Sequence, residues 1–247
     1  SAHFHSHNII KEHERETKKH LDFGTLAHTL FLEPEQFHKE FAVIPADAPK
    51  PPTDVMRNAK KPSEDSIIRV QWWDNFAAEH GDKITITAEQ LAGAKRIAEN
   101  LMKLSSYAVM QNNYGMPEAS IFFTDPVYGL ELRIRPDYHI APCKALPNGL
   151  MFDVKTSRDA RPYKFSKDCG DMGYSLSASM YREGFQQYYG TESKPDFIYL
   201  VAENVAPFNV KQYRASDLFL SVGDNQYNKA KELLAESLLI NEWDGYS

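Results

Sequence analysis

A chain of 247 residues with 42% hydrophobic and 25% charged side chains has the composition of an ordinary globular protein and can bury a sizeable core. The net charge of -6 excludes a generally basic coat for nucleic acid, and no apolar run approaches the roughly 20 residues that span a membrane. The two cysteines, Cys143 and Cys169, exclude a disulfide framework and a four-cysteine iron–sulfur site, so we expect a cytoplasmic protein.

Residues 1–20 are dense in histidine and charge. A metal-binding tract is one interpretation of these histidines, and a solvated tail or a frayed helix is the favoured one. The abrupt start also suggests a fragment of a longer protein. We therefore expect a tail over residues 1–20 and a single domain over residues 21–247.

A first helix is predicted from Gly24, with Thr25 as its cap and Pro34 as its end. His28 falls between apolar neighbours on this helix. A lone histidine in such a place is more often a satisfied core residue than a metal ligand.

Residues 41–62 are rich in proline and lysine, which predicts an exposed connector and not a domain boundary. The spacing of apolar residues predicts a helix over residues 67–80. A further helix is predicted after Thr87, whose hydroxyl would cap it. Both helices are interpreted as scaffold.

A sheet is predicted to begin over residues 117–124, and residues 125–129 form a turn that leads into a strand over residues 130–137. Alternate side chains of a strand face opposite ways. The apolar face of this strand would carry Leu130, Leu132 and Ile134, and its polar face Glu131, Arg133, Arg135 and Asp137.

The charged residues of this region have two interpretations each. Arg133 and Arg135 share the face of Asp137, so they either touch a phosphate or pair with Glu131. Glu118 is either an accessory acid of a site or a plain acid of an edge strand.

A second strand, over residues 150–156, carries Asp153 and Lys155 on one face, which we expect to be the solvent face. An antiparallel hairpin of this strand with residues 130–137, through a turn over residues 142–149, would bring Asp137 close to Asp153.

Two carboxylates at such range would not normally both ionise, and a divalent cation removes that conflict. A lysine beside them can hold a water or stabilise a developing oxyanion. Hard oxygen ligands suit Mg2+ or Mn2+ better than zinc. Asp-x-Lys alone is a weak signal, because a solvated strand end with a surface ion pair has the same pattern.

The rest of the chain predicts a helix start at residues 156–160, whose amides could face a phosphate. A helix over residues 173–185 follows, then strands over residues 197–202 and 208–213 and a closing helix from about residue 226 to 240. The expected fold is one compact α/β domain, with a central mixed β-sheet flanked by helices on both faces.

The order of these motifs resembles the PD-(D/E)xK nuclease superfamily. Its signature is an acid, a variable loop and then acid-x-lysine, here Arg135-Pro136-Asp137 followed by Asp153-Val154-Lys155. Gly24 and His28 match the Gly-x-x-x-His of its RecB-like branch. The run around them is similar to the exonuclease VIII (RecE) family of prophage recombination nucleases, and this likeness covers most of the chain.

The resemblance implies a role for each matching residue. His28, Asp137, Asp153 and the main-chain oxygen of Val154 would hold Mg2+, with Mn2+ as a substitute, in one or two sites. Lys155 would orient or help to deprotonate the attacking water.

The resemblance also implies a DNA contact from the helix over residues 173–185. Tyr181 stands in register with the tyrosine of the family's Gln-x-x-x-Tyr motif, but Ser177 replaces the glutamine. Glu118 sits where related nucleases often carry an acid near the metals. The loop between Asp137 and Asp153 is longer than the resemblance would lead us to expect.

The implied activity is ATP-independent digestion of linear double-stranded DNA from 5′ ends, which leaves 3′ single strands for an annealing protein. One alternative is a catalytically idle DNA-binding or assembly subunit on the same fold. A second is an endonuclease on that fold. The presence of all four core residues favours an enzyme.

A body of net charge -6 cannot hold DNA by broad electrostatic attraction, so a processive enzyme would gain from enclosing its substrate. We therefore expect a closed homo-oligomeric ring. By resemblance, a tetramer is the first choice and a trimer the second.

Overall fold

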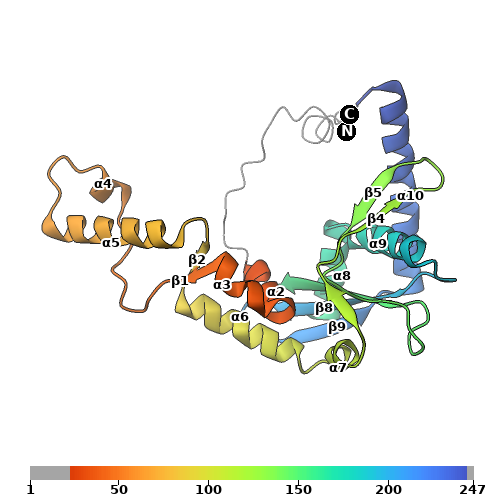
Figure 1. The fold of residues 1–247 in the computed structure, drawn as a ribbon, viewed down its shortest axis with the longest axis horizontal. Helices are drawn as coiled ribbons and strands as arrows, with labels where there is room; N and C mark the ends of the chain where they lie inside the picture. The colour runs from red at the N-terminus through yellow and green to blue at the C-terminus, as the bar shows by residue number, and fades with distance from the viewer. Residues whose placement is uncertain (1–22, 244–247) are drawn as a thin grey trace. The chain divides into compact units, whose positions relative to one another are not determined.

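The computed structural model describes residues 23–243 of the chain. These residues form two compact units, residues 23–98 and residues 99–243, and the boundary falls within helix α6 (Ala88–Leu101) (Figure 1). The predicted histidine-rich tail over residues 1–20 lies outside the described residues. The expectation of a single domain over residues 21–247 stays a prediction.

The first unit is mainly helical and holds a small parallel sheet. Strand β1 pairs with β2, with Phe41 opposite Ile84 and Val43 opposite Ile86. The elements of this unit are α2 (Phe23–Leu32), η2 (Pro34–Gln36), α3 (Phe37–Glu40), β1 (Phe41–Val43), α4 (Asp54–Arg57), α5 (Glu64–His80), β2 (Ile84–Ile86) and most of α6.

Two local predictions for this unit are confirmed. The helix predicted over residues 67–80 is α5, which starts three residues earlier because the Ser63 hydroxyl accepts from the Ser66 amide and caps it. Thr87 caps α6 by accepting from the Gln90 amide, and the Gln90 side chain accepts in return from the Thr87 amide at 2.8 Å. This reciprocal capping box fixes the start of the helix.

Two other predictions for this unit are wrong. Thr25 is not a cap, because the helix is already formed at Phe23 and Thr25 lies inside it. Residues 41–62 are not a plain connector, because Phe41 is almost fully buried and begins β1. Apolar residues before the prolines therefore enter the core of this unit.

The second unit contains a five-stranded mixed sheet in the order β3-β6-β7-β8-β9, together with a two-stranded β4–β5 hairpin. Figure 1 shows the helices that flank the sheet. The elements are α7 (Ser105–Gln111), β3 (Gly115–Pro117), β4 (Ile121–Thr124), β5 (Glu131–Ile134), β6 (Tyr138–Ile140), β7 (Leu150–Ser157), α8 (Pro162–Asp171), α9 (Tyr174–Tyr189), β8 (Asp196–Glu203), β9 (Val210–Arg214) and α10 (Asp217–Ile240).

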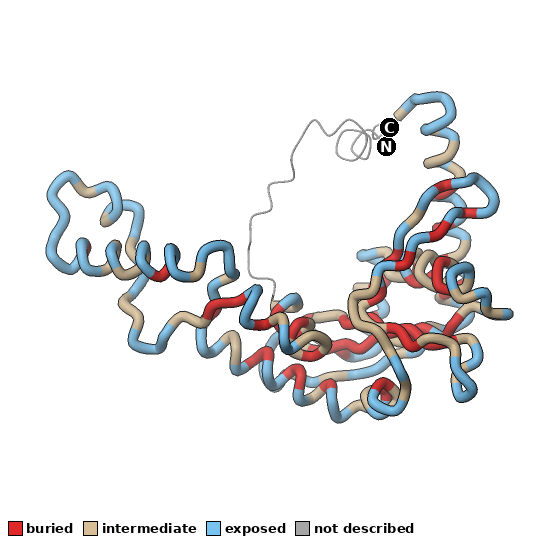
Figure 2. The backbone as a smooth tube through the Cα atoms, viewed as in Figure 1, coloured by how far each residue is buried: buried red, intermediate tan, exposed pale blue. Residues whose placement is uncertain are grey.

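Strand β7 is the centre of this sheet. It pairs antiparallel with β6 on one side and parallel with β8 on the other, along its full length from Leu150 to Ser157. Figure 2 shows β7 and β8 as almost continuously buried. Asp153 is 6% exposed, so the prediction of a solvent face is wrong for this residue, whereas the Lys155 side chain is 27% exposed. A strand with a parallel partner is covered on both faces.

The predicted turn over residues 125–129 joins β4 to β5, which confirms that hairpin. The predicted pairing of residues 130–137 with β7 is wrong, because β5 pairs with β4 and ends at Ile134. Pro136 has no amide hydrogen for a strand ladder, so the chain bends and a separate strand, β6, begins at Tyr138. The turn over residues 142–149 then joins β6 to β7.

One cluster of apolar side chains packs the sheet against the helices that follow it. Its centre is formed by Met151, Phe185, Phe197 and Val201, all buried. The helix predicted at residues 156–160 is absent there, because β7 continues to Ser157 and α8 begins only at Pro162. The closing helix α10 starts at Asp217, earlier than predicted, with the Ser216 hydroxyl as its cap.

Helices α9 and α10 pack closely at Gly223. A Cβ at this position would collide with the backbone carbonyl of Ser175, so only glycine permits the approach. The Ser179 hydroxyl donates to the Leu220 carbonyl at 3.2 Å, and Ser175 donates to Gln226 at 2.8 Å. Small residues on both helices thus define this interface.

A buried group of three charges ties the β4–β5 turn to these helices. The Lys231 ammonium on α10 donates to Asp125 in the turn at 2.5 Å and to Glu183 on α9 at 2.9 Å. The side chain of Asp125 is fully buried and that of Lys231 is 6% exposed. Burial raises the pKa of Asp125, but the ammonium outweighs it and holds that pKa below its usual range.

Candidate functional site

The central strand β7 positions the acid and the lysine of the Asp-x-Lys motif. Their side chains share one face, and the Lys155 ammonium lies 2.5 Å from a carboxylate oxygen of Asp153. The Asp153 side chain is 8% exposed and that of Lys155 is 27% exposed. The pair therefore opens to solvent at the lysine end.

Asp137 is attached to the same strand from the bend after Pro136. Its carboxylate accepts a hydrogen bond of 2.6 Å from the main-chain amide of Val154, which stands between Asp153 and Lys155. This bond joins the two halves of the signature, although Asp137 itself lies outside the strands. The backbone of β7 thus fixes where this acid points.

Glu118 completes a group of acids at this end of the sheet. Its main-chain amide donates to the carbonyl of Asp137 at 3.1 Å, and carboxylate oxygens of the two residues lie within 4.8 Å of each other. Its φ of 48° is in the left-handed region, which a residue other than glycine seldom adopts. Such strain is concentrated at functional sites.

The arginines of this region behave differently from each other. Arg135 forms an ion pair with Glu118 at 2.9 Å and not with Glu131, which accepts from the Thr124 hydroxyl. Arg133 is exposed on β5, opposite Phe122. Arg135 therefore lies beside the acids through its ion pair with Glu118, whereas Arg133 is exposed on the β4–β5 hairpin.

The pKa shifts of Lys155 and Tyr181 reflect the nearby carboxylates. Burial lowers the pKa of Lys155, but Asp153 and then Asp137 outweigh it, so that the pKa is raised and the ammonium is retained. Burial raises the pKa of Tyr181, and Asp153 and Asp137 raise it further. Asp137, Asp153, Lys155 and Tyr181 therefore influence one another directly.

Tyr174 is a member of the site that the sequence analysis missed. The Lys155 ammonium lies 5.2 Å from the centre of its ring, within the range of a cation–π contact. Tyr174 precedes Tyr181 by seven residues on α9, which is two helical turns, so both point to the same side. The seven-residue spacing of the two tyrosines is the feature of the sequence that could have identified Tyr174.

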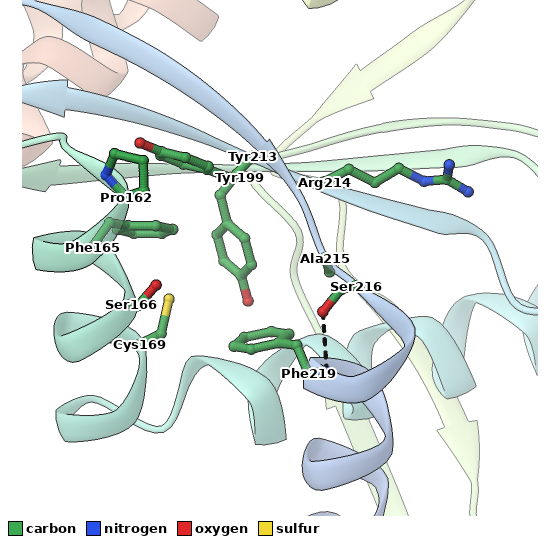
Figure 3. A pocket seen from close by; sticks show the side chains of 10 residues that line it. All are labelled: Pro162, Phe165, Ser166, Cys169, Tyr199, Tyr213, Arg214, Ala215, Ser216 and Phe219. Carbon is green, nitrogen blue, oxygen red and sulfur yellow. Dashed lines mark hydrogen bonds between the residues drawn. The ribbon is translucent and has the colours of Figure 1, made fainter.

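An aromatic pocket of about 170 Å³ is lined by residues of α8, β8, β9 and the start of α10 (Figure 3). The rings of Phe165 and Tyr213 stack there at 5.1 Å, and Tyr199 and Phe219 meet edge to face. Burial raises the pKa of Tyr199, and Asp153 adds to the rise. Cys169, which also lines this pocket, has its pKa raised to about 11 by burial, with Asp168 and Asp153 adding to the rise.

A divalent cation fits the oxygens that this unit assembles. Calcium–oxygen or magnesium–oxygen bonds of about 2.0–2.6 Å allow two ligand atoms of one ion to stand within about 5 Å of each other. The carboxylates of Glu118 and Asp137 meet that condition. His28 lies on α2 in the first unit and is half-buried, so its part in a metal site stays a prediction.

The comparisons with known proteins agree with this geometry. The family described as "PDDEXK-like domain of unknown function (DUF3799)" matches residues 2–246. The chain belongs to this family. The PDDEXK-like assignment confirms the resemblance to the PD-(D/E)xK superfamily and the predicted α/β fold, and it is consistent with a RecE-like domain. The family match therefore supports a nuclease in general.

One solved structure shows a similar fold. The crystal structure of a putative exonuclease from Eubacterium rectale has a TM-score of 0.50 to this PDDEXK-like chain at 14% identity. The match covers 71% of this chain and 64% of that one, so the chain spans less than two thirds of its relative. The structure of SSO0001 matches 85% of both chains at 13% identity, but its TM-score of 0.32 carries no argument. No curated protein matches the sequence.

A membrane-spanning helix is not present among residues 23–243, because no helix there is both long and apolar enough.

Proposed function

We propose that this chain is a Mg2+-dependent, ATP-independent exodeoxyribonuclease that degrades linear duplex DNA from 5′ ends and leaves 3′ single strands. The observation that carries the proposal is the hydrogen bond that ties Asp137 to the strand of Asp153 and Lys155. The name of the Eubacterium rectale protein, which has the same fold, supports an exonuclease among the nuclease classes.

The acids would hold the divalent cation. Asp137, Asp153 and Glu118 would contribute carboxylate oxygens, with the main-chain oxygen of Val154 and the imidazole of His28 as further ligands. These hard donors suit Mg2+ or Mn2+. When bound, the cation supplies Lewis-acid activation of the phosphodiester.

The chain's own cations and hydroxyls would act on the reacting phosphate. Lys155 would orient the attacking water or help to deprotonate it, and its ammonium would donate hydrogen bonds to the negative charge that develops at phosphorus. Tyr181 and Arg135 border the acids and would contact the DNA backbone.

Digestion of duplexes labelled at either end, with Mg2+ and with EDTA, tests the activity and its polarity. The expected result is metal-dependent release of nucleotides from 5′ ends without ATP. Asp153→Asn and Lys155→Ala should each lower the rate at least about 100-fold, the usual scale for loss of one transition-state contact. Asp171→Asn and Lys144→Ala change exposed residues outside the site and are the matched controls.

Two outcomes would replace the proposal. Release of no nucleotides by the wild-type chain with Mg2+ or Mn2+ would point to an idle DNA-binding subunit. Cutting of closed circular DNA would point to an endonuclease, because an exonuclease needs an end.

An exonuclease that digests long DNA must stay bound to it over many steps. A chain of net charge -6 gains little from broad attraction to DNA, so we infer a closed homo-oligomer, a tetramer first, around a passage for the duplex. The 3′ strands that remain would pass to a single-strand annealing protein. Light scattering tests the ring: a strict monomer that digests long duplexes without release would contradict it.

A further inference from the structure

A second hollow lies in the residue 99–243 unit, at the end of the sheet toward which β7 runs beyond Lys155. Its volume is about 440 Å³, far above the roughly 10–15 Å³ that one water requires. Its walls come from the end of α6, the loop before α8 and the β8–β9 hairpin. We call this the cationic hollow, and its polar side chains are Asn100, Lys103, Arg161, Glu203, Asn209 and Lys211.

Its position follows from the pairing of β7 with β8. Ser157, the last residue of β7, is in register with Glu203, and its carbonyl accepts from the Asn204 amide at 2.9 Å. Ser157 lies two positions beyond Lys155, a rise of about 7 Å along the strand. The hollow is therefore within reach of the same nucleic-acid strand that meets Lys155.

Three cations face this hollow against one acid. The single carboxylate, Glu203, already accepts from the Ala160 amide at 3.2 Å and from the Asn209 side chain at 2.8 Å. The Glu203 carboxylate thus connects the loop before α8 to the β8–β9 hairpin. Lys103 and Lys211 are exposed, and within the described residues neither forms an ion pair.

Arg161 is held in a fixed orientation. Asp159 accepts from its Nε at 3.0 Å and from one terminal nitrogen at 2.6 Å. These contacts use one edge of the guanidinium and leave N–H groups of the terminal nitrogens for another acceptor. A planar, oriented guanidinium beside two lysines matches the geometry and charge of a phosphate.

We propose that the cationic hollow binds a backbone phosphate of the nucleic-acid strand whose scissile bond lies at Asp153 and Lys155. The proposal rests on the proposed nuclease function. Lys103 and Lys211 supply the charge, and Arg161 supplies directed hydrogen bonds. In a chain of net charge -6, this hollow provides the local attraction that the whole molecule lacks.

The test measures binding of a labelled, 5′-phosphorylated duplex in EDTA over a range of salt concentrations. Lys103→Gln/Lys211→Gln should weaken binding at least about threefold and reduce the slope of log affinity against log salt by about 0.9, the usual contribution of one phosphate contact. Lys229→Gln removes an exposed lysine of α10, outside the hollow, and should change neither quantity. Equal melting temperatures of the variants exclude a folding effect.

Wild-type affinity and slope in the double variant would overturn the proposal. Titration with dAMP and with inorganic phosphate separates a strand phosphate from a free one. A loss of dAMP binding in the double variant, with duplex binding unchanged, would mean that the hollow serves free nucleotides and would also overturn it. A chain that binds duplex as expected but releases no nucleotides with Mg2+ would instead contradict the nuclease function and leave the hollow's role intact.

Discussion

Replacement of Lys231 with methionine tests how much the buried charges contribute to stability. Methionine keeps most of the volume of the lysine but leaves Asp125 and Glu183 without their common cation. Removing one partner of a buried pair typically costs about 3–5 kcal/mol. For a chain of this size, each kcal/mol lowers the melting temperature by roughly 2–4 °C, so we expect a decrease of about 10 °C.

The assay is urea unfolding followed by circular dichroism, with the thermal midpoint measured in parallel. Lys229→Met is the control, because Lys229 lies two residues away on the same helix but pairs with Glu232 on the surface. It should change the free energy of unfolding by less than about 1 kcal/mol. Asp125→Asn in the Lys231→Met background should recover part of the loss, since it removes the uncompensated charge. Equal losses for Lys231→Met and Lys229→Met would refute the reasoning.

Three further predictions concern the same unit and the first helix. Gly223→Ala should lower the melting temperature by several degrees, because its methyl group would meet the Ser175 carbonyl, and an unchanged temperature would contradict this close packing. The folded pKa of Asp125 is depressed, so its contribution is complete above its unfolded value of about 3.9 and lost as the pH falls through the folded pKa. The free energies of unfolding of the wild type and Asp125→Asn should therefore begin to converge as the pH falls below about 4, and a constant difference between them would exclude this linkage. His28→Ala should lower metal-dependent activity with little change in the melting temperature of the metal-free chain, whereas a large decrease in that temperature would identify a core histidine.

Local features of the fold were predictable where neighbouring residues determine them. The capping pair at Thr87 and Gln90 and the turn at Asp125, whose carboxylate accepts from the Tyr128 amide, are encoded within a few residues. The bend at Pro136 could also have been predicted, because proline cannot extend a ladder.

Long-range pairing was not predictable in the same way. Alternation along β7 assigned Asp153 and Lys155 to one face, but it could not show that this face is covered, since the covering depends on β8 and α9. The acid group likewise depends on β3 pairing with β6, which places Glu118 beside Asp137. The motif therefore predicted that Asp137 lies beside the strand of Asp153 and Lys155, and tertiary packing determined their burial.

The order of strands in the sheet has a consequence for synthesis of the chain. β6 and β7 are joined by a short loop and can pair early, but the other neighbour of β7 is β8, which follows only after two helices. Contacts between residues far apart in sequence form late, and a ribosome releases the chain from its N-terminus. The nascent chain thus carries Asp153 and Lys155 before it has the strand that holds them in place. The surroundings of Asp153 and Lys155 are therefore completed only after β8 has been synthesised.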